Sequence, residues 1–246
     1  MILVGVSLVY ALSLTSCQPD EGAPENLNAS SDEMDWRCAQ NSKVYPPNAH
    51  PFGQSYKEWT EDWWQWLMTF DCAGSPLLDP TGEHATQNQS GPVFFLVGTT
   101  GGAVERNVTI PRTKAILFPL INIINDFPCP DTSFHPAPGQ TLEDFLQEGA
   151  AAFIDLADNL SVTLDGDELN DPENYRFQTD LFQFTGNPDL TNCLDPCVTG
   201  QVQDAVSDGY WMMLKKLHHG NHTLHFYAEV PDYGFVVDVT YNITVP

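Results

Sequence analysis

The segment Phe235-Val-Val-Asp-Val-Thr-Tyr-Asn-Ile-Thr-Val245 decides the fold class of this chain. Every odd-numbered position in it is apolar, whereas positions 238, 240, 242 and 244 carry Asp, Thr, Asn and Thr. A period of two residues is that of a β-strand with one face in the core and one in water. The segment therefore predicts a long strand in a sheet that has one wet face.

Working back from this strand, seven further segments have strand character: 92–97, 106–110, 115–124, 160–164, 175–184, 210–214 and 223–228. The continuous apolar runs 92–97 and 115–124 suit strands that are covered on both faces. Asp165-Gly166 predicts a hairpin turn after 160–164. Short strands punctuated by 19 Pro and 17 Gly indicate a mainly β fold, a jelly roll or related antiparallel β-sandwich.

Two capping boxes predict two α-helices that flank the sandwich. Ser55-Tyr-Lys-Glu58 opens a helix to about Phe70, and Thr141-Leu-Glu-Asp144 opens another to about Ala157. In the first helix, Tyr56, Trp59, Trp63, Trp66 and Phe70 form an aromatic stripe at three- and four-residue steps.

The aromatic stripe has two interpretations, packing on a sheet or stacking against sugars, and we expect packing. Trp64 lies off the stripe, so it is the tryptophan predicted to be exposed and a candidate ligand-binding residue.

Composition excludes one large class of function. The chain has 33 acidic against 9 basic residues and a formal net charge of −24. Nucleic acid requires a basic footprint, which this chain does not supply, and a polybasic membrane patch is excluded for the same reason. The excess of acidic residues predicts self-repulsion that cations relieve.

The N-terminus predicts export and a lipid anchor. Residues 1–16 form an uncharged apolar run of signal-peptide type, and Leu14-Thr-Ser-Cys17 resembles the lipobox of bacterial lipoproteins. Cys17 is then the lipidated residue, and Gln18 indicates the outer membrane in a cell with two membranes. An ordinary signal peptide is the alternative.

Residues 17–35 are acidic and poor in large apolar side chains, which is typical of a flexible tether. We therefore expect one folded domain over residues 36–246, exported and held at the cell envelope.

Cysteine usage agrees with export, because the chain has no Cys-x-x-Cys pair of the kind found in zinc sites. Spacing predicts that Cys193 pairs with Cys197 in a small loop and that Cys38 pairs with Cys72 around the first helix. Cys129 is then the thiol left over. Spacing alone leaves other connectivities open.

Several strings together resemble a family of exported bacterial proteins that has no established activity. They are Trp63-Trp-Gln-Trp66, Gln89-Ser-Gly-Pro-Val-Phe-Phe-Leu96, Lys114-Ala-Ile-Leu-Phe-Pro-Leu-Ile-Asn122, Asp208-Gly-Tyr-Trp211 and Asp238-Val-Thr-Tyr-Asn-Ile-Thr-Val245. The resemblance covers most of the chain after Gly53. It implies the fold and export, and it carries no catalytic residues.

Calcium is the one cofactor that a local motif indicates. Asp165, Asp167, Asn170 and Asp171 offer hard oxygen ligands around a tight turn, although the spacing is not that of an EF-hand. An acidic hairpin turn without an ion is the alternative. Asp126, Asp204 and Asp208 form a second acidic set that no spacing links.

Histidines gather late in the chain. His218 and His219 lie beside a Gly-Asn turn and are candidate ligand-binding residues, whereas His222 and His225 have opposite parity and should point to opposite faces of a strand.

These observations predict a surface-tethered, non-catalytic binding or structural module whose partner is a glycan, a peptide or an envelope protein. The alternative is a hydrolase that acts on polysaccharide through a pair of carboxylates, because acidic residues are abundant. A concave pocket that holds a perturbed carboxylate pair favours the enzyme, and a flat polar or aromatic face favours binding.

Overall fold

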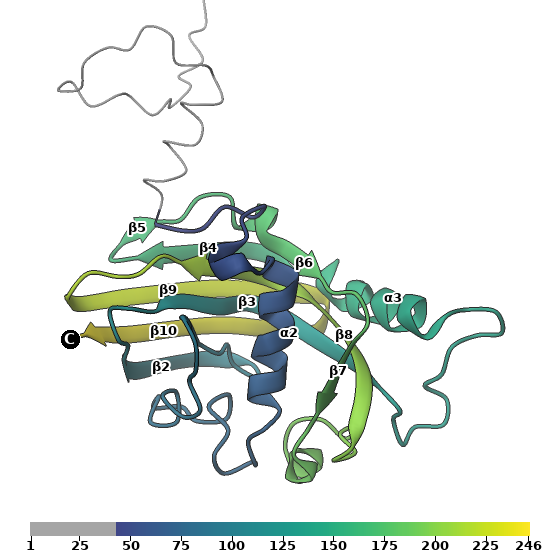
Figure 1. The fold of residues 1–246 in the computed structure, drawn as a ribbon. Helices are drawn as coiled ribbons and strands as arrows, with labels where there is room; N and C mark the ends of the chain where they lie inside the picture. The colour runs from purple at the N-terminus through teal and green to yellow at the C-terminus, as the bar shows by residue number, and fades with distance from the viewer. Residues whose placement is uncertain (1–42) are drawn as a thin grey trace, which may run out of the picture. The chain divides into compact units, whose positions relative to one another are not determined.

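A computed structural model describes residues 43–246 of the chain (Figure 1). The predicted signal peptide, Cys17, the tether and Cys38 lie outside the described residues. None of the helices within 43–246 combines the length and the apolar character that a membrane-spanning helix needs.

Sheet B contains the strand that decided the fold class. Its order is β2-β10-β9-β4-β5, with β10 paired antiparallel to β9 and parallel to β2. The predicted alternation of β10 is confirmed: Val237, Val239, Tyr241, Ile243 and Val245 are buried. The strands are β2 (Gly102–Thr109), β4 (Asp158–Leu164), β5 (Asp167–Glu168), β9 (Gly220–Val230) and β10 (Phe235–Val245).

Sheet A has the order β1-β3-β8-β6, and β7 also pairs with β8. The strand predicted over 210–214 begins much earlier, at Val202, and the segment predicted over 175–184 is divided between β6 and β7. The strands are β1 (Val93–Phe95), β3 (Ala115–Phe127), β6 (Arg176–Gln178), β7 (Phe182–Thr185) and β8 (Val202–Leu214).

The two sheets pack face to face, which confirms a mainly β sandwich. The rings of Phe118 in β3 and Phe226 in β9 lie 5.1 Å apart between the sheets. The Tyr241 hydroxyl donates to the Val97 carbonyl oxygen at 2.9 Å and joins the sheets at their margin. Both sheets are antiparallel except for one parallel pair each, β1–β3 and β2–β10.

Two α-helices flank the sandwich as predicted, and both are shorter than predicted: α2 (Tyr56–Leu67) and α3 (Leu142–Ile154). The capping box of α2 is present, and the Thr141 side chain caps α3. Residues 43–246 also contain short 3-10 turns: η1 (Pro51–Gly53), η2 (Pro172–Tyr175), η3 (Pro188–Asn192) and η4 (Pro231–Tyr233).

The helix α2 covers the face of sheet A that points away from sheet B. Its aromatic stripe is buried as predicted, with Trp59 5%, Trp63 1% and Trp66 8% exposed. The Trp63 ring lies 5.1 Å from the Trp211 ring of β8, and its indole nitrogen donates to the Leu96 carbonyl oxygen at 2.8 Å. Packing on a sheet is therefore the role of the stripe.

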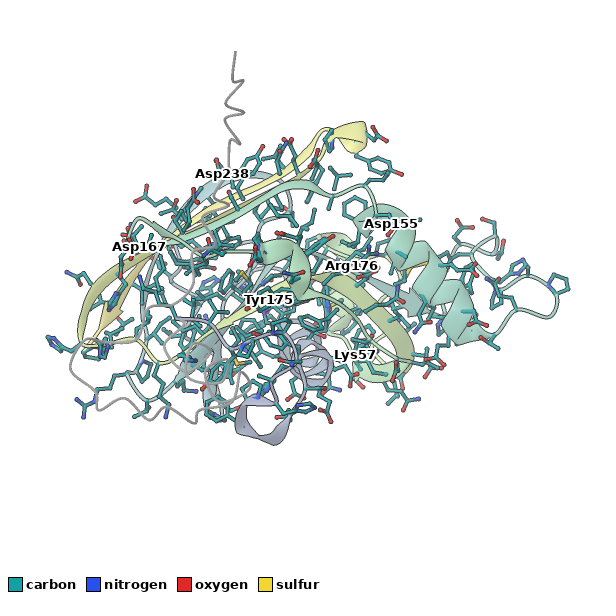
Figure 2. The ribbon with its side chains drawn as sticks, turned by 90° about the horizontal axis from the view of Figure 1, so that it is seen from above. Lys57, Asp155, Asp167, Tyr175, Arg176 and Asp238 are labelled. Atoms are coloured by element: carbon teal, nitrogen blue, oxygen red, sulfur yellow. A yellow bond between two sulfur atoms is a disulfide. The ribbon has the colours of Figure 1, made fainter. Side chains whose placement is uncertain are left out.

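The helix α3 packs on the opposite face of sheet A, against the ends of β3 and β8. A side chain at Gly149 would meet the Asn125 amide of β3 at 2.5 Å, so glycine permits this close approach. The end of α3 is fastened by Arg176, which binds Asp155 at 2.7 Å and the fully buried Asp208 at 2.8 Å (Figure 2). Arg176 thus compensates the buried charge of Asp208.

Candidate functional site

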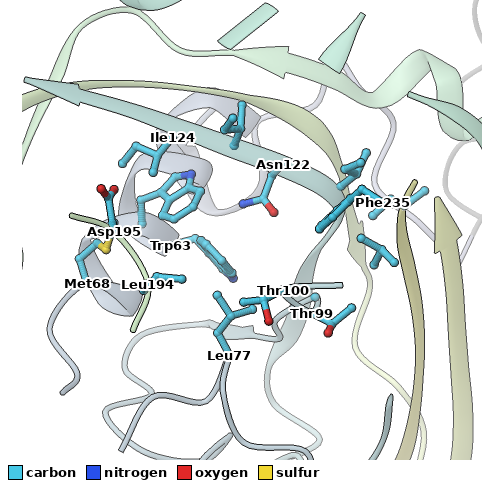
Figure 3. A pocket seen from close by; sticks show the side chains of 16 residues that line it. Trp63, Met68, Leu77, Thr99, Thr100, Asn122, Ile124, Leu194, Asp195 and Phe235 are labelled. Carbon is cyan, nitrogen blue, oxygen red and sulfur yellow. The ribbon is translucent and has the colours of Figure 1, made fainter. Parts of the chain in front are cut away.

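A pocket of about 320 Å³ opens where α2, β3 and β10 come together (Figure 3). Its lining is mainly apolar and includes the loops around Gly98 and Asp195. Such a volume lies at the lower end of the range for ligand sites and suits a small ligand or one side chain of a larger one. The lining residues are Trp63, Trp64, Met68, Leu77, Gly98, Thr99, Thr100, Leu120, Ile121, Asn122, Ile123, Ile124, Leu194, Asp195, Phe235 and Val237.

Asn122 supplies a polar group in this apolar lining. Its side-chain nitrogen is buried and has no hydrogen-bond partner among the described residues. The nearby indole nitrogens of Trp63 and Trp64 are already bonded, to the Leu96 carbonyl and to the Ser207 hydroxyl. A buried donor without a partner is costly, so the Asn122 amide is the polar group of this lining whose hydrogen bonding is incomplete.

A pair of carboxyl groups lies at one end of the pocket. Asp195 lines the pocket, and Asp126 lies behind it, 2% exposed and hydrogen-bonded to it. Burial raises the pKa of Asp126 to about 8, and the charge of Asp195 adds to the shift. The amide of Gln203 donates to Asp126 from the other side. The carboxyl group of Asp126 therefore keeps its proton near neutral pH.

The separation of these two carboxyl groups bears on the hydrolase alternative. Retaining glycosidases need carboxyl groups about 5–5.5 Å apart, and inverting enzymes need about 6.5–9.5 Å. Oxygens of Asp126 and Asp195 lie within 4.8 Å and the groups are hydrogen-bonded. This pair is too close for either mechanism, although it is a perturbed pair beside a concave pocket.

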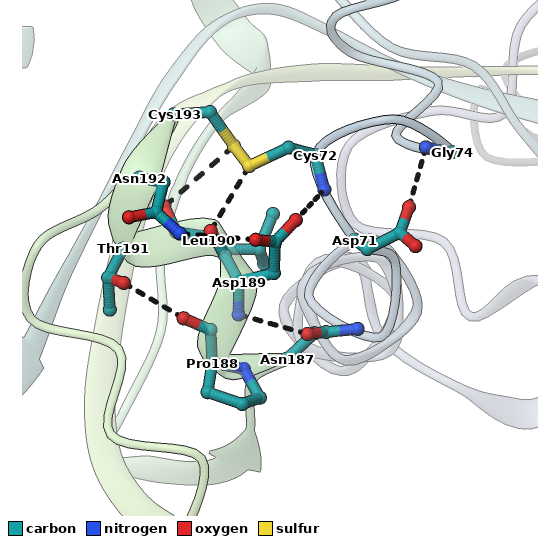
Figure 4. The surroundings of a disulfide bond; sticks show 10 residues. All are labelled: Asp71, Cys72, Gly74, Asn187, Pro188, Asp189, Leu190, Thr191, Asn192 and Cys193. Atoms are coloured by element: carbon teal, nitrogen blue, oxygen red, sulfur yellow. Dashed lines mark hydrogen bonds between the residues drawn. A yellow bond between two sulfur atoms is a disulfide. The ribbon is translucent and has the colours of Figure 1, made fainter.

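Two disulfides hold the wall of the pocket that carries Leu194 and Asp195. Cys72 pairs with Cys193 (Figure 4), and Cys129 pairs with Cys197. The predicted pairs Cys193–Cys197 and Cys38–Cys72 are therefore wrong, and Cys129 is not a free thiol.

The error in pairing has a local cause. Cys193 directly follows η3 and points to the loop after α2, where Asp189 accepts from the Cys72 backbone nitrogen at 3.0 Å. Cys197 turns towards the chain that leaves β3, with its backbone nitrogen bonded to the Asp195 carboxylate at 2.9 Å. Cys193 and Cys197 are close in sequence, but their side chains point to opposite sides of one loop and bond different partners.

The opposite wall of the pocket is held by Arg106, which is 1% exposed. Its guanidinium donates to the carbonyl oxygens of Gly98 at 2.7 Å, Asp79 at 2.7 Å and Leu77 at 3.2 Å. Gly98 and Leu77 both line the pocket, so one buried side chain fixes two of its loops. Disulfides on one side and Arg106 on the other make the pocket preformed.

Trp64 is not exposed, so that prediction is wrong. It is 6% exposed, and its indole nitrogen donates to the Ser207 hydroxyl at 2.7 Å. The physical reason is that β8 and the surrounding loops contact α2 on more than one side, so they bury more than one stripe of the helix. Trp64 nevertheless lines the pocket, where its ring lies 4.9 Å from that of Trp63.

The candidate calcium ligands do not line this pocket: Asp165 lies in the β4–β5 turn, Asp167 lies in β5, and Asn170 and Asp171 follow β5. Asp165 is bonded through one oxygen to His222 and through the other to the Thr223 backbone nitrogen, and Asp167 pairs with Lys43 at 2.7 Å. Asp171 begins η2. Asn170 is exposed. The three carboxylates do not converge.

Within residues 43–246, the group of three acidic, histidine or cysteine ligand atoms that does converge is Asp126, Asp195 and Cys197. The sulfur of Cys197 is in a disulfide, so it is no thiolate ligand. Of the second acidic set, Asp126 joins this group, whereas Asp204 accepts from Gln183 and Asp208 binds Arg176.

The histidines take separate positions. His218 and His219 are exposed in the loop between β8 and β9 and do not line the pocket. His222 and His225 point to opposite faces of β9, as predicted, and bond Asp165 and Asp238. Burial disfavours the charged form of His222, but its hydrogen bonds to Asp165 and to the His218 carbonyl outweigh this and raise its pKa.

Comparisons of the chain with known protein families, with curated proteins and with solved structures gave no match.

Proposed function

We propose that this protein is an exported, lipid-anchored binding module that captures a peptide or a peptide-like group of an envelope partner in the pocket between α2, β3 and β10. The observation that carries the proposal is the buried side-chain nitrogen of Asn122, which has no hydrogen-bond partner within residues 43–246 and lies in an apolar pocket that ends at the Asp126–Asp195 pair. These groups suit a ligand with an apolar body, a carbonyl acceptor and a positive charge.

A perturbed carboxyl pair in a concave pocket favours an enzyme by itself, but the close approach of Asp126 and Asp195 does not suit a glycosidase and supports a binding role instead. The preformed walls of the pocket favour affinity. Binding to a rigid site avoids the ordering cost that a flexible loop would add. The two disulfides support folding in an oxidising compartment, in agreement with the export predicted from residues 1–16.

The anchor is tested separately from the pocket. Replacing Cys17 by serine should abolish metabolic labelling with palmitate and move the protein out of the detergent phase. Unchanged partitioning of the Cys17→Ser protein would end the lipoprotein proposal while leaving the pocket untouched.

Leucinamide is the simplest probe of the pocket, because it joins an apolar side chain, a carbonyl acceptor and an ammonium group. Binding is followed by the fluorescence of Trp63 and Trp64, which line the pocket. We expect leucinamide to bind more tightly than neutral N-acetylleucinamide, and anionic N-acetylleucine to bind weakest, because the carboxyl pair carries a negative charge.

Two variants test the assignment. Asn122→Leu should weaken leucinamide binding about tenfold, the effect of about 1.4 kcal/mol. Thr100→Trp should block the pocket, because Thr100 is exposed at its lining. The matched control is Thr109→Trp on the outer face of sheet B. Equal affinities of all three variants and the native chain would refute the proposal.

A further inference from the structure

The strand β3 has a free edge beside the pocket. On that side β3 pairs with β1 through Ala115, Ile116 and Leu117, and β1 ends at Phe95. Beyond Leu117, no strand within residues 43–246 pairs with this edge, although β3 continues to Phe127. Its residues 120–124 line the pocket.

Hydrogen bonds on the far side of β8 show which backbone groups of β3 point to this edge. The Thr179 backbone nitrogen donates to the Ser207 carbonyl at 2.8 Å, and the Ser207 nitrogen donates to the Thr179 hydroxyl at 3.0 Å. The backbone groups of Ser207 thus point away from β3. Ile124 lies opposite Ser207 in the antiparallel pair. Opposite residues both point inward or both point outward.

The N–H and C=O of Ile124 therefore point to the free edge, and so do those of Asn122, two residues earlier. The side chains of both residues lie on the α2 face of the sheet, where the pocket is. The edge thus presents backbone donors and acceptors at strand spacing, next to an apolar pocket and an unpartnered amide.

Resting on the proposed function, we propose that the ligand is an extended peptide that adds to β3 as an extra strand along Asn122–Ile124. One apolar side chain of the peptide enters the pocket, and a Lys or Arg side chain lies at the Asp126–Asp195 end. Strand addition obtains affinity from main-chain hydrogen bonds and specificity from pockets for alternate side chains.

The negative charge of the chain favours a cationic peptide at this edge over a second copy of the chain. An unpaired edge is a site where strands of another molecule can pair. The formal net charge of −24 opposes pairing between two copies and favours a cationic peptide. Pro119, which has no N–H, and the bulge between Pro119 and Ile121 confine the added strand to the part of β3 that follows them.

The test uses the full chain and a library of acetylated, amidated pentapeptides with a central apolar residue and a terminal lysine. The tightest binder is resynthesised in two forms, N-methylated at one backbone nitrogen or at the next. Adjacent N–H groups of a strand point to opposite edges. We therefore expect one form to bind about tenfold or more weakly and the other to bind within about twofold of the parent peptide.

Amide hydrogen exchange on the protein gives an independent measure of strand addition. Bound peptide should slow exchange at Asn122 and Ile124, whose N–H groups face the edge. Exchange at Ile123 should change little, because its N–H is already directed at β8.

The outcomes separate this inference from the proposed function. Equal weakening by the two N-methyl groups, protection at Ile123 alone, or dimerisation of the chain through this edge would overturn strand addition. Leucinamide binding without any peptide binding would overturn it too and leave the pocket function standing. Binding of neither probe would overturn both.

Discussion

The two sheets formed by residues 43–246 have five strands each and differ in their exposure to water. Sheet A is covered by α2 on one face and by sheet B and α3 on the other, and its buried polar residues include Gln203, Ser207 and Asp208. Sheet B keeps one face in water, where Asp238 points outward (Figure 2). The comparison shows that polar side chains belong to the buried core in sheet A, whereas they lie on the solvent-exposed surface in sheet B.

The wet face of sheet B is a lattice of polar side chains that bond one another across strands. The Asn242 amide donates to Glu105 at 2.7 Å, the Thr244 hydroxyl donates to Asn221 at 3.2 Å, and His225 bonds Asp238 at 2.9 Å. Water can replace each of these bonds, so each contributes little. Substitutions on the two sheets should therefore differ sharply in cost.

The largest difference should appear between Trp63 and Thr240. Trp63→Ala removes a ring that is 1% exposed and packed against sheet A, so it should cost about 3–5 kcal/mol in the free energy of unfolding. Thr240→Ala on the wet face should change that free energy by about 0.5 kcal/mol or less. Guanidinium unfolding measures both. A Trp63→Ala protein of native stability would contradict the assignment of the stripe to the core.

The disulfides come next, because both fasten loops around sheet A. Cys72 and Cys193 are 121 residues apart and Cys129 and Cys197 are 68 apart. Cross-links over loops of this length should contribute about 2–5 kcal/mol each. Cys72→Ser and Cys129→Ser should each lower the melting temperature and weaken leucinamide binding, since both bridges brace the wall at Leu194. Unaltered melting on reduction would refute these pairings.

The pH dependence of stability should arise at the buried Asp126 of sheet A and not at carboxylates on the exposed face of sheet B. Its pKa is about 8 in the folded chain and about 3.9 unfolded, so the folded state binds more protons between these values. Stability should therefore fall as pH rises from about 4 to about 8. Asp126→Asn keeps a donor for Asp195 and an acceptor for Gln203, so it should remove this slope.

At pH 8 the Asp126→Asn protein should have a higher free energy of unfolding than the native chain, because its neutral amide avoids burying a second negative charge beside Asp195. Asp238→Asn on the wet face is the matched control and should leave the slope in place. Urea unfolding from pH 4 to pH 9 measures both. A native slope retained in Asp126→Asn would show that another group titrates.

The smallest specific effect should be that of calcium at the β4–β5 turn of sheet B. Asp165 and Asp167 are engaged by His222, Thr223 and Lys43, so millimolar calcium should raise the melting temperature no further than sodium chloride of equal ionic strength. Both salts should stabilise the acidic chain by screening. A calcium-specific increment that Asp167→Asn erases would restore the calcium site.

The comparison also explains which elements the sequence predicts. One face of β10 is exposed to water, so polar and apolar residues alternate along the strand and the sequence alone predicts it. The first half of β8 is buried on both faces yet carries the polar residues Gln203, Ser207 and Asp208. Its sequence therefore has no apolar run or alternation that would predict a strand. Each is satisfied by a partner distant in sequence, such as Arg176 for Asp208, and local patterns do not contain such partners.

The pocket was less predictable than the fold. We interpret 115–124 as a continuous apolar run, but it contains the polar residue Asn122, and this exception is the signal that could have identified it. Asp195 lies in an ordinary Leu-Asp-Pro sequence that gives no signal of a site. The loop that places it beside Asp126 is held by two disulfides, and the spacing of the cysteines predicted the wrong pairs. Assembly of a site from separate loops is a tertiary property.

The disulfide connectivity has a consequence for the order of oxidation. In the unfolded chain, closing the 121-residue loop of Cys72–Cys193 costs about 3 kcal/mol more than joining Cys193 to Cys197, four residues away. Unguided oxidation therefore favours a bond that the folded protein does not contain. Reaching the native connectivity from this bond therefore requires thiol–disulfide exchange, in which a thiolate attacks and reopens it.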